Sequence, residues 1–209
     1  MVLPLVLLLL FSSSLGHAGT PPYEIPSSCN ENQECPPYRV VAYDKGNAFE
    51  IRQYESPVWV SSVPVNGSFS VASIIGFASL YSFFGGNNDA DMSIPLTGPT
   101  VTKVSSSSTG TPTCTVYFYV PKKIQENPPS SQETQVVRWP AGHHAAVRRF
   151  SGVAGDVNVP LEVEKLKQSL QGSPWQGNTT SPDYHVASFV NPLLQGDDSI
   201  NEIMFIFDQ

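Results

Sequence analysis

The side chains best suited to catalysis are scattered along this 209-residue chain and form no known catalytic motif. Nucleophilic catalysis needs a nucleophile beside a base, and no G-x-S-x-G turn presents a serine. His143 and His144 are adjacent, so on a strand they point to opposite faces and cannot bind one metal ion together. His185 lies in a strand pattern, where packing or exposure to solvent is its expected role. We therefore expect no enzymatic activity.

The segments that could hold ions also have the wrong spacing. Asn87–Asp91 offers oxygen ligands but lacks the ligand order and the terminal glutamate of a calcium loop. Gly85–Gly86 follows an apolar segment and opens no helix, unlike a phosphate-binding loop. The three cysteines have no nearby histidine at the spacing of zinc ligands. We expect no metal site.

Cysteines and sequons indicate export from the cell. In an oxidising compartment, an odd number of cysteines implies one disulfide and one free thiol. Cys29 and Cys35 flank a short polar loop and are expected to pair, which leaves Cys114 free; a Cys35–Cys114 bridge is the alternative. Asn66 and Asn178 each begin an N-x-S/T sequon, so both are expected to be glycosylated.

The amino terminus supports the same compartment. Residues 2–11 form an apolar run that is shorter than the ~20 residues of a membrane-spanning helix. Small residues follow, so residues 1–18 are expected to be a signal peptide cut after Ala18, with an uncleaved anchor as the alternative. We expect a secreted protein without membrane contact after cleavage. Residues 19–37 form a Pro- and Ser-rich leader, and residues 38–209 form the folded domain.

Charge argues against a nucleic-acid partner. Eleven Lys and Arg stand against 18 Asp and Glu, a net charge of −7, whereas nucleic-acid binding needs clustered basic residues. Aromatic residues make up 11% of the chain, which is enough to build a packed core.

Periodicity predicts an α+β domain built from two similar units. Alternation predicts strands at 49–54, 58–63, 100–104, 113–120, 135–139, 144–150, 184–189 and 202–207. Helices are expected at 67–84, with Ser68 as N-cap, and at 160–170. Phe49–Tyr54 resembles Ala145–Phe150, so a unit of strand pair, helix and strand pair is expected twice. The first helix is apolar on most faces and is expected to be buried or to border a ligand pocket.

Several segments, in chain order, resemble the motifs of one known family. Phe49–Tyr54 followed by Trp59–Ser61 resembles Y-E-I-R-x-Y…W-V-S, and Phe83–Asn88 resembles Y-I-x-G-x-N. Ile94–Thr100 resembles I-x-M-T-x-P-V. Further similarities lie at 117–121, 147–152 and 201–203. Together these segments resemble the SOUL/heme-binding-protein family.

The resemblance implies a twisted antiparallel β-barrel of two related halves flanked by two α-helices. It also implies non-enzymatic binding of heme or a related tetrapyrrole on an apolar surface near the first helix. Position 53 is a histidine in some members, and Gln53 stands there in this chain. Ile74 and Ser82 occupy positions that are basic in other members. The remaining expected contacts on that helix are Phe77, Ala78 and Tyr81.

An amide is a poor ligand for ferric iron and imidazole a common one, so no axial ligand is identified. We expect apolar contacts to hold the ring, and Gln53→His to strengthen its binding. Two other functions remain open: a secreted structural or protein-interaction domain that no longer binds heme, and a carrier of another apolar small molecule.

Overall fold

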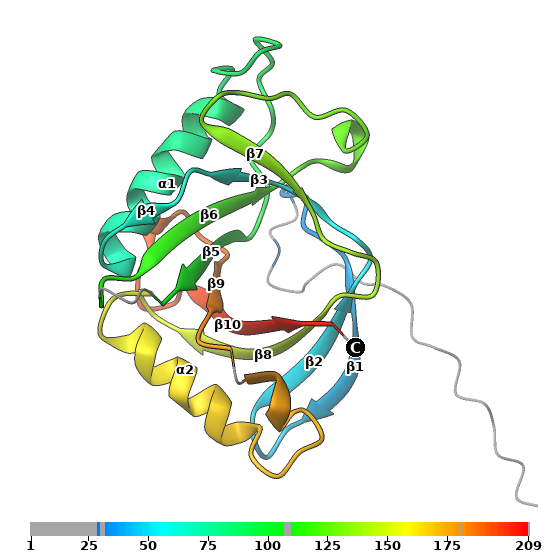
Figure 1. Ribbon diagram of the computed structural model, residues 1–209, viewed down its shortest axis with the longest axis vertical. Coiled ribbons are helices and arrows are strands. Elements are labelled where there is room, and N and C mark those ends of the chain that lie inside the picture. Colours follow the sequence, from blue (N-terminus) through cyan, green and yellow to red (C-terminus); the bar gives the residue numbers. More distant parts are fainter. Residues whose placement is uncertain (1–28, 30–31, 107–109, 180, 209) are drawn as a thin grey trace, which may run out of the picture.

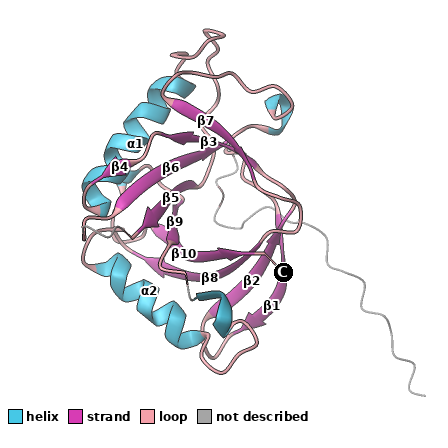
Figure 2. Ribbon diagram, viewed as in Figure 1, coloured by secondary structure: helices cyan, strands magenta, loops and turns pink. Residues whose placement is uncertain are grey.

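The computed structural model describes residue 29 and residues 32–106, 110–179 and 181–208. The expected signal peptide and most of the expected leader lie outside these residues. Ten antiparallel strands form one curled sheet, with two helices on its outer side (Figures 1 and 2). The helices are α1 (Phe69–Phe84) and α2 (Asn158–Ser169). This arrangement confirms the predicted α+β fold.

The strands run in the order β1-β2-β8-β10-β9-β5-β6-β3-β7, and β4 lies beside β6. Their bounds are β1 Tyr38–Asp44, β2 Phe49–Tyr54, β3 Val58–Ser62, β4 Val65–Asn66, β5 Thr100–Ser105, β6 Thr113–Tyr119, β7 Thr134–Arg138, β8 His144–Ser151, β9 Tyr184–Ser188 and β10 Ile200–Phe207. Three single-turn 3-10 helices complete the described elements: η1 Lys122–Ile124, η2 Gln176–Thr179 and η3 Pro192–Leu194.

The predicted repeat is present, but the two similar hexapeptides are not its equivalent strands. The sheet order is symmetric about the β9–β5 pair, which matches β10 with β6, β8 with β3 and β2 with β7. The helices obey the same symmetry, because α1 packs on β6 and β3 while α2 packs on β10 and β8. Strand β2, Phe49–Tyr54, therefore lies next to β8 in the sheet, with Ile51 opposite Ala146. Its equivalent in the other half is β7, not β8.

Strand alternation separates the core into an outer and an inner face. Outward side chains of β2, β8 and β10 pack beneath α2, and those of β3 and β6 pack beneath α1. Aromatic side chains dominate the inner, concave face, where Trp59 contacts Tyr119 and Trp139. Both faces are apolar, as expected for a sheet with helices on one side and a curl on the other.

One buried ion pair crosses the concave face. Arg52 donates two hydrogen bonds of 2.7 Å to the carboxylate oxygens of Glu202, and both side chains are 1% exposed. Arg52 Nε also donates to Glu50, and the guanidinium carbon lies 4.1 Å from the ring centroid of Tyr38. Bidentate geometry and the extra partners offset the cost of removing these charges from water.

Helix α1 lies unusually close to the sheet at Gly76. A Cβ atom at this position would lie 2.5 Å from Val116 Cγ2 on β6, so only glycine fits there. Ser68 is the N-cap residue as predicted, but its side chain makes no capping bond. Asp156, which precedes α2, takes that role by accepting a 3.1 Å hydrogen bond from the Ser70 amide.

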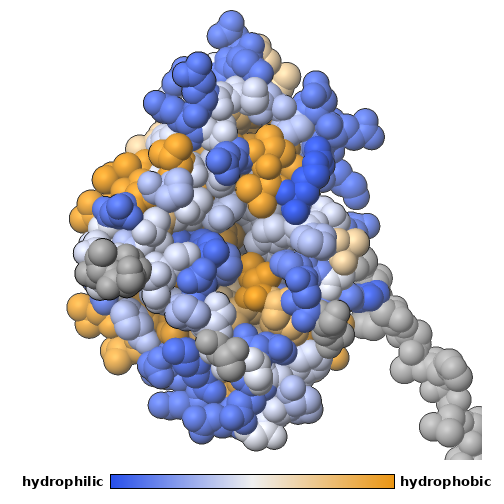
Figure 3. Space-filling view, viewed as in Figure 1, coloured by the Kyte–Doolittle hydropathy of each residue, from blue (hydrophilic) through white to orange (hydrophobic). Residues whose placement is uncertain are grey.

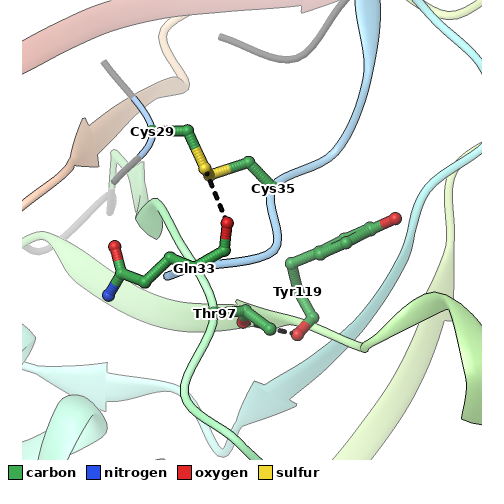
Figure 4. The surroundings of a disulfide bond; sticks show 5 residues. All are labelled: Cys29, Gln33, Cys35, Thr97 and Tyr119. Carbon is green, nitrogen blue, oxygen red and sulfur yellow. Dashed lines mark hydrogen bonds between the residues drawn. A yellow bond between two sulfur atoms is a disulfide. The ribbon is translucent and has the colours of Figure 1, made fainter. Parts of the chain in front are cut away.

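The disulfide predicted between Cys29 and Cys35 is confirmed, with a Cα–Cα distance of 6.3 Å (Figure 4). Cys29 Sγ lies 3.1 Å from the carbonyl oxygen of Gln33 inside the closed loop. This loop docks on the segment between α1 and β5, because Gly98 N–H donates to the Glu34 carbonyl over 3.0 Å. Cys114 on β6 is free and fully buried, as expected.

Candidate functional site: the exposed face of α1

The 16 residues of α1 contain no charged side chain, although six of them are exposed to solvent. Its inner side is buried against β3 and β6. The outer side presents Val71 (57% exposed), Ile74 (41%), Ile75 (50%) and Tyr81 (52%). These positions recur every three or four residues and therefore share one face of the helix. An exposed apolar face of this kind is uncommon in soluble proteins and typical of binding surfaces.

The 3-10 helix η3 extends this surface. It contacts α1, and its Leu193 and Leu194 are 64% and 73% exposed. Asn191 holds the turn by accepting a 2.9 Å hydrogen bond from the Leu193 amide. Hydrophobic atoms gather along the edge of the molecule over α1 in Figure 3. Leu193 and Leu194 thus add apolar surface beside the exposed residues of α1. We refer to these exposed residues as the α1 face, which comprises Val71, Ile74, Ile75, Ala78, Tyr81 and Ser82.

The structure places five of the six predicted cofactor contacts on α1. Ile74, Ala78, Tyr81 and Ser82 are exposed on the α1 face. Phe77 is 6% exposed and points inward, where its ring lies 5.2 Å from that of Phe118. It also stacks on Tyr81, with ring centroids 5.9 Å apart. Phe77 therefore supports the face from below.

The sixth predicted contact, Gln53, lies elsewhere. It is half-buried on β2 and pairs with Arg39 on one side and His144 on the other. Arg39 Nε donates a 2.6 Å hydrogen bond to Gln53 Oε1. Figure 1 shows β2 and α1 at opposite ends of the molecule. The structure therefore does not bring Gln53 to the α1 face.

The α1 face offers apolar contacts but no ligand for a metal. Its exposed side chains are aliphatic and aromatic, and α1 itself supplies neither a histidine nor a basic residue. In the described part of the chain, no three His, Cys, Asp or Glu side chains come close enough together to hold a metal ion. None of the described helices is long and apolar enough to cross a membrane.

A hollow, separate from the α1 face, lies on the concave face of the sheet, and the sequence did not predict it. It has a volume of about 280 Å³, and its lining includes Lys103, Tyr117, Trp139 and His185. Burial, and secondarily the Lys103 charge, lowers the pKa of His185 to about 3. Alternation alone puts Lys103 and Tyr117 on inner faces of their strands, but only the sheet order brings β9 beside β5.

Comparisons with known proteins agree with the predicted family resemblance. A family model described as SOUL heme-binding protein matches residues 33–206. Heme-binding protein 2 of Mus musculus is 32% identical over 108 residues, which cover 50% of this chain and 53% of that protein. The match thus spans about half the length of this relative.

Heme-binding protein 1 of Xenopus laevis is 25% identical over 166 residues, covering 77% of this chain and 84% of its own length. Among solved structures, a hydrolase from Listeria innocua is similar with a TM-score of 0.49 and 11% identity, over 77% of this chain and 92% of that one.

Proposed function

We propose a binding function without catalysis for this chain, which belongs to the SOUL heme-binding protein family. In this proposal the α1 face holds heme or a related tetrapyrrole. The observation that supports this placement is a 16-residue helix without charge on which four large apolar side chains, Val71, Ile74, Ile75 and Tyr81, are about half exposed. Relatives named for heme binding support the class of ligand. We propose that apolar contact with the ring supplies most of the affinity.

The expected energies follow from the exposed area that a ring would cover. Full burial of an aliphatic side chain contributes about 1.5–3 kcal/mol, so a half-exposed isoleucine has about 1 kcal/mol left to gain. Removing one such contact should weaken binding roughly fivefold. Because the ring and not the metal makes these contacts, hemin and iron-free protoporphyrin should bind with similar affinity.

The test compares two exposed apolar residues on the two helices. Ile75 on the α1 face and Leu161 on α2 are 50% and 58% exposed. Hemin and protoporphyrin IX are titrated into wild type, Ile75→Gln and Leu161→Gln, followed by the Soret band and tryptophan quenching. We expect Ile75→Gln to weaken both ligands and Leu161→Gln to leave both unchanged. Equal effects of the two substitutions would reject the α1 face as the site.

A third variant separates this proposal from the arrangement implied by the family resemblance, in which position 53 borders the heme. Gln53→His introduces an imidazole on β2, away from α1. If the ring lies on the α1 face, the hemin spectrum should not change. A new low-spin Soret band in this variant would move the site to β2 instead.

We further propose that the protein is secreted and glycosylated. The Cys29–Cys35 disulfide supports an oxidising compartment. Asn66 is exposed at the end of β4, while Asn178 is half-buried in η2. Expression in secretory cells, followed by enzymatic removal of N-glycans, should shift the mass of wild type. Asn66→Gln should remove part of that shift, and an unglycosylated secreted product would contradict the glycan assignment.

A further inference from the structure

The hollow on the concave face has the features of a second binding site, separate from the α1 face. Side chains from β5, β6, β9 and β10 converge there, next to Trp139 at the end of β7. Lys103 and His185 are register partners on the adjacent strands β5 and β9, so their side chains lie side by side on the same face of the sheet. In Figure 3, hydrophobic atoms lie in the middle of this side of the molecule, among hydrophilic ones.

His185 provides an unmet hydrogen-bonding group in this hollow. Its Nδ1 atom is buried and has no hydrogen-bond partner in the described part of the chain. Burial keeps the imidazole neutral near pH 7, with a pKa of about 3. A buried polar atom without a partner costs about 1–3 kcal/mol. A molecule that bonds to Nδ1 would remove that cost.

The charged pair that lines the hollow compensates itself. Lys103 Nζ lies 3.0 Å from Asp183 Oδ2, which also accepts a 3.0 Å hydrogen bond from Ser105 Oγ. Asp208, whose Oδ1 lies 2.6 Å from His143 Nδ1, is 79% exposed and directs its charge to solvent. Burying a charged ligand there without a counter-charge would be costly, so a neutral ligand is favoured.

Size and wall chemistry narrow the ligand further. A volume of about 280 Å³ lies at the lower end of small-molecule sites and is suited to one or two fused rings. Tyr117 and Trp139 line the hollow, with Val137 and Ile206 completing its apolar part. Trp139 also contacts the His185 ring, with centroids 6.5 Å apart. Aromatic walls favour planar aromatic molecules through stacked and edge contacts.

We propose that this hollow binds a neutral, planar heteroaromatic molecule of one or two rings, which hydrogen-bonds to His185 Nδ1. The site is built by the inner face of the sheet and shares no residue with the α1 face. The proposal therefore does not depend on tetrapyrrole binding.

The probe is 7-azaindole, which is neutral and carries a donor and an acceptor nitrogen side by side, so it can bond to either tautomer of His185. Indene has the same two-ring shape without nitrogen. Calorimetric titrations give both dissociation constants for wild type and for His185→Phe. We expect 7-azaindole to bind wild type, and the affinity ratio of 7-azaindole to indene to fall at least tenfold in His185→Phe.

Two further variants locate the site if His185→Phe folds poorly. Val137 lies on the edge strand β7, where Val137→Phe should fill the hollow and abolish the binding of both probes. Ile75→Gln on the α1 face should leave both affinities unchanged. The proposal is overturned if 7-azaindole does not bind wild type at millimolar concentration, if Val137→Phe has no effect, or if Ile75→Gln abolishes binding.

Discussion

Gly76→Ala tests whether the close approach of α1 to the sheet outweighs helix propensity. In an isolated helix this substitution stabilises by about 1 kcal/mol. Here the new Cβ would lie 2.5 Å from Val116 Cγ2 and 2.9 Å from Val116 Cβ. Val116 is fully buried and β-branched, so its side chain has little freedom to rotate away. The helix itself must move outward.

The size of the effect follows from these opposing contributions. Overpacking a core costs about 1–3 kcal/mol, and contacts this short on a rigid neighbour belong at the upper end. With the propensity gain subtracted, Gly76→Ala should lower the free energy of unfolding by about 2 kcal/mol. For a domain of this size that corresponds to a fall in Tm of about 4–8 °C. Urea denaturation and thermal melts measure both quantities.

A control and a double mutant make the assignment specific. An added Cβ at Gly177 meets no atom within 4 Å, so Gly177→Ala should be nearly neutral. In a Val116→Ala background the 2.5 Å contact with Cγ2 is lost while the 2.9 Å contact with Cβ remains, so Gly76→Ala should cost clearly less than it does in wild type. The reasoning fails if Gly76→Ala stabilises wild type, or if its cost is the same with alanine at position 116.

Three more predictions concern buried groups. Arg52→Met leaves the Glu202 carboxylate buried without its bidentate partner, so it should lower the free energy of unfolding, measured by urea denaturation, by about 3–5 kcal/mol. The double mutant Arg52→Met/Glu202→Met should recover much of that loss. Equal stability of the single and the double mutant would contradict the prediction. Burial lowers the pKa of His185 to about 3 in the folded state, so below pH 6.5 the unfolded chain binds one proton more than the folded one. The free energy of unfolding of wild type should therefore fall by about 1.4 kcal/mol by pH 5.5, and that of His185→Phe should not show this fall. Parallel pH profiles of stability for the two proteins would refute the prediction. Burial raises the pKa of Cys114 to about 11, so its thiol should react with a disulfide reagent only after denaturation, and fast labelling of native protein would show otherwise.

Local sequence patterns predicted the elements well, since each depends on neighbours along the chain. Alternation placed the strand at Phe49–Tyr54 without error. The polar loop between Cys29 and Cys35 was sufficient to predict their bond, because few residues separate the two.

Long-range order was harder to predict. The hexapeptide similarity suggested the wrong pair of equivalent strands, because it reflects similar surroundings on adjacent strands and not the symmetry of the sheet. For His185 only packing or exposure to solvent was predicted, because the strand that pairs with its own, β5, comes about 80 residues earlier in the chain. The need for glycine at position 76 depends on a contact with β6 that no periodicity reports.

The two symmetry-related helices differ in surface charge, which divides two properties of the protein between them. Helix α2 carries Glu162, Glu164, Lys165 and Lys167, which form ion pairs on its surface, while α1 carries no charge. Helix α2 therefore presents a charged surface to solvent, whereas α1 leaves an apolar face free to associate with another molecule. Solubility and binding can thus be altered separately, because substitutions on one helix leave the surface of the other unchanged.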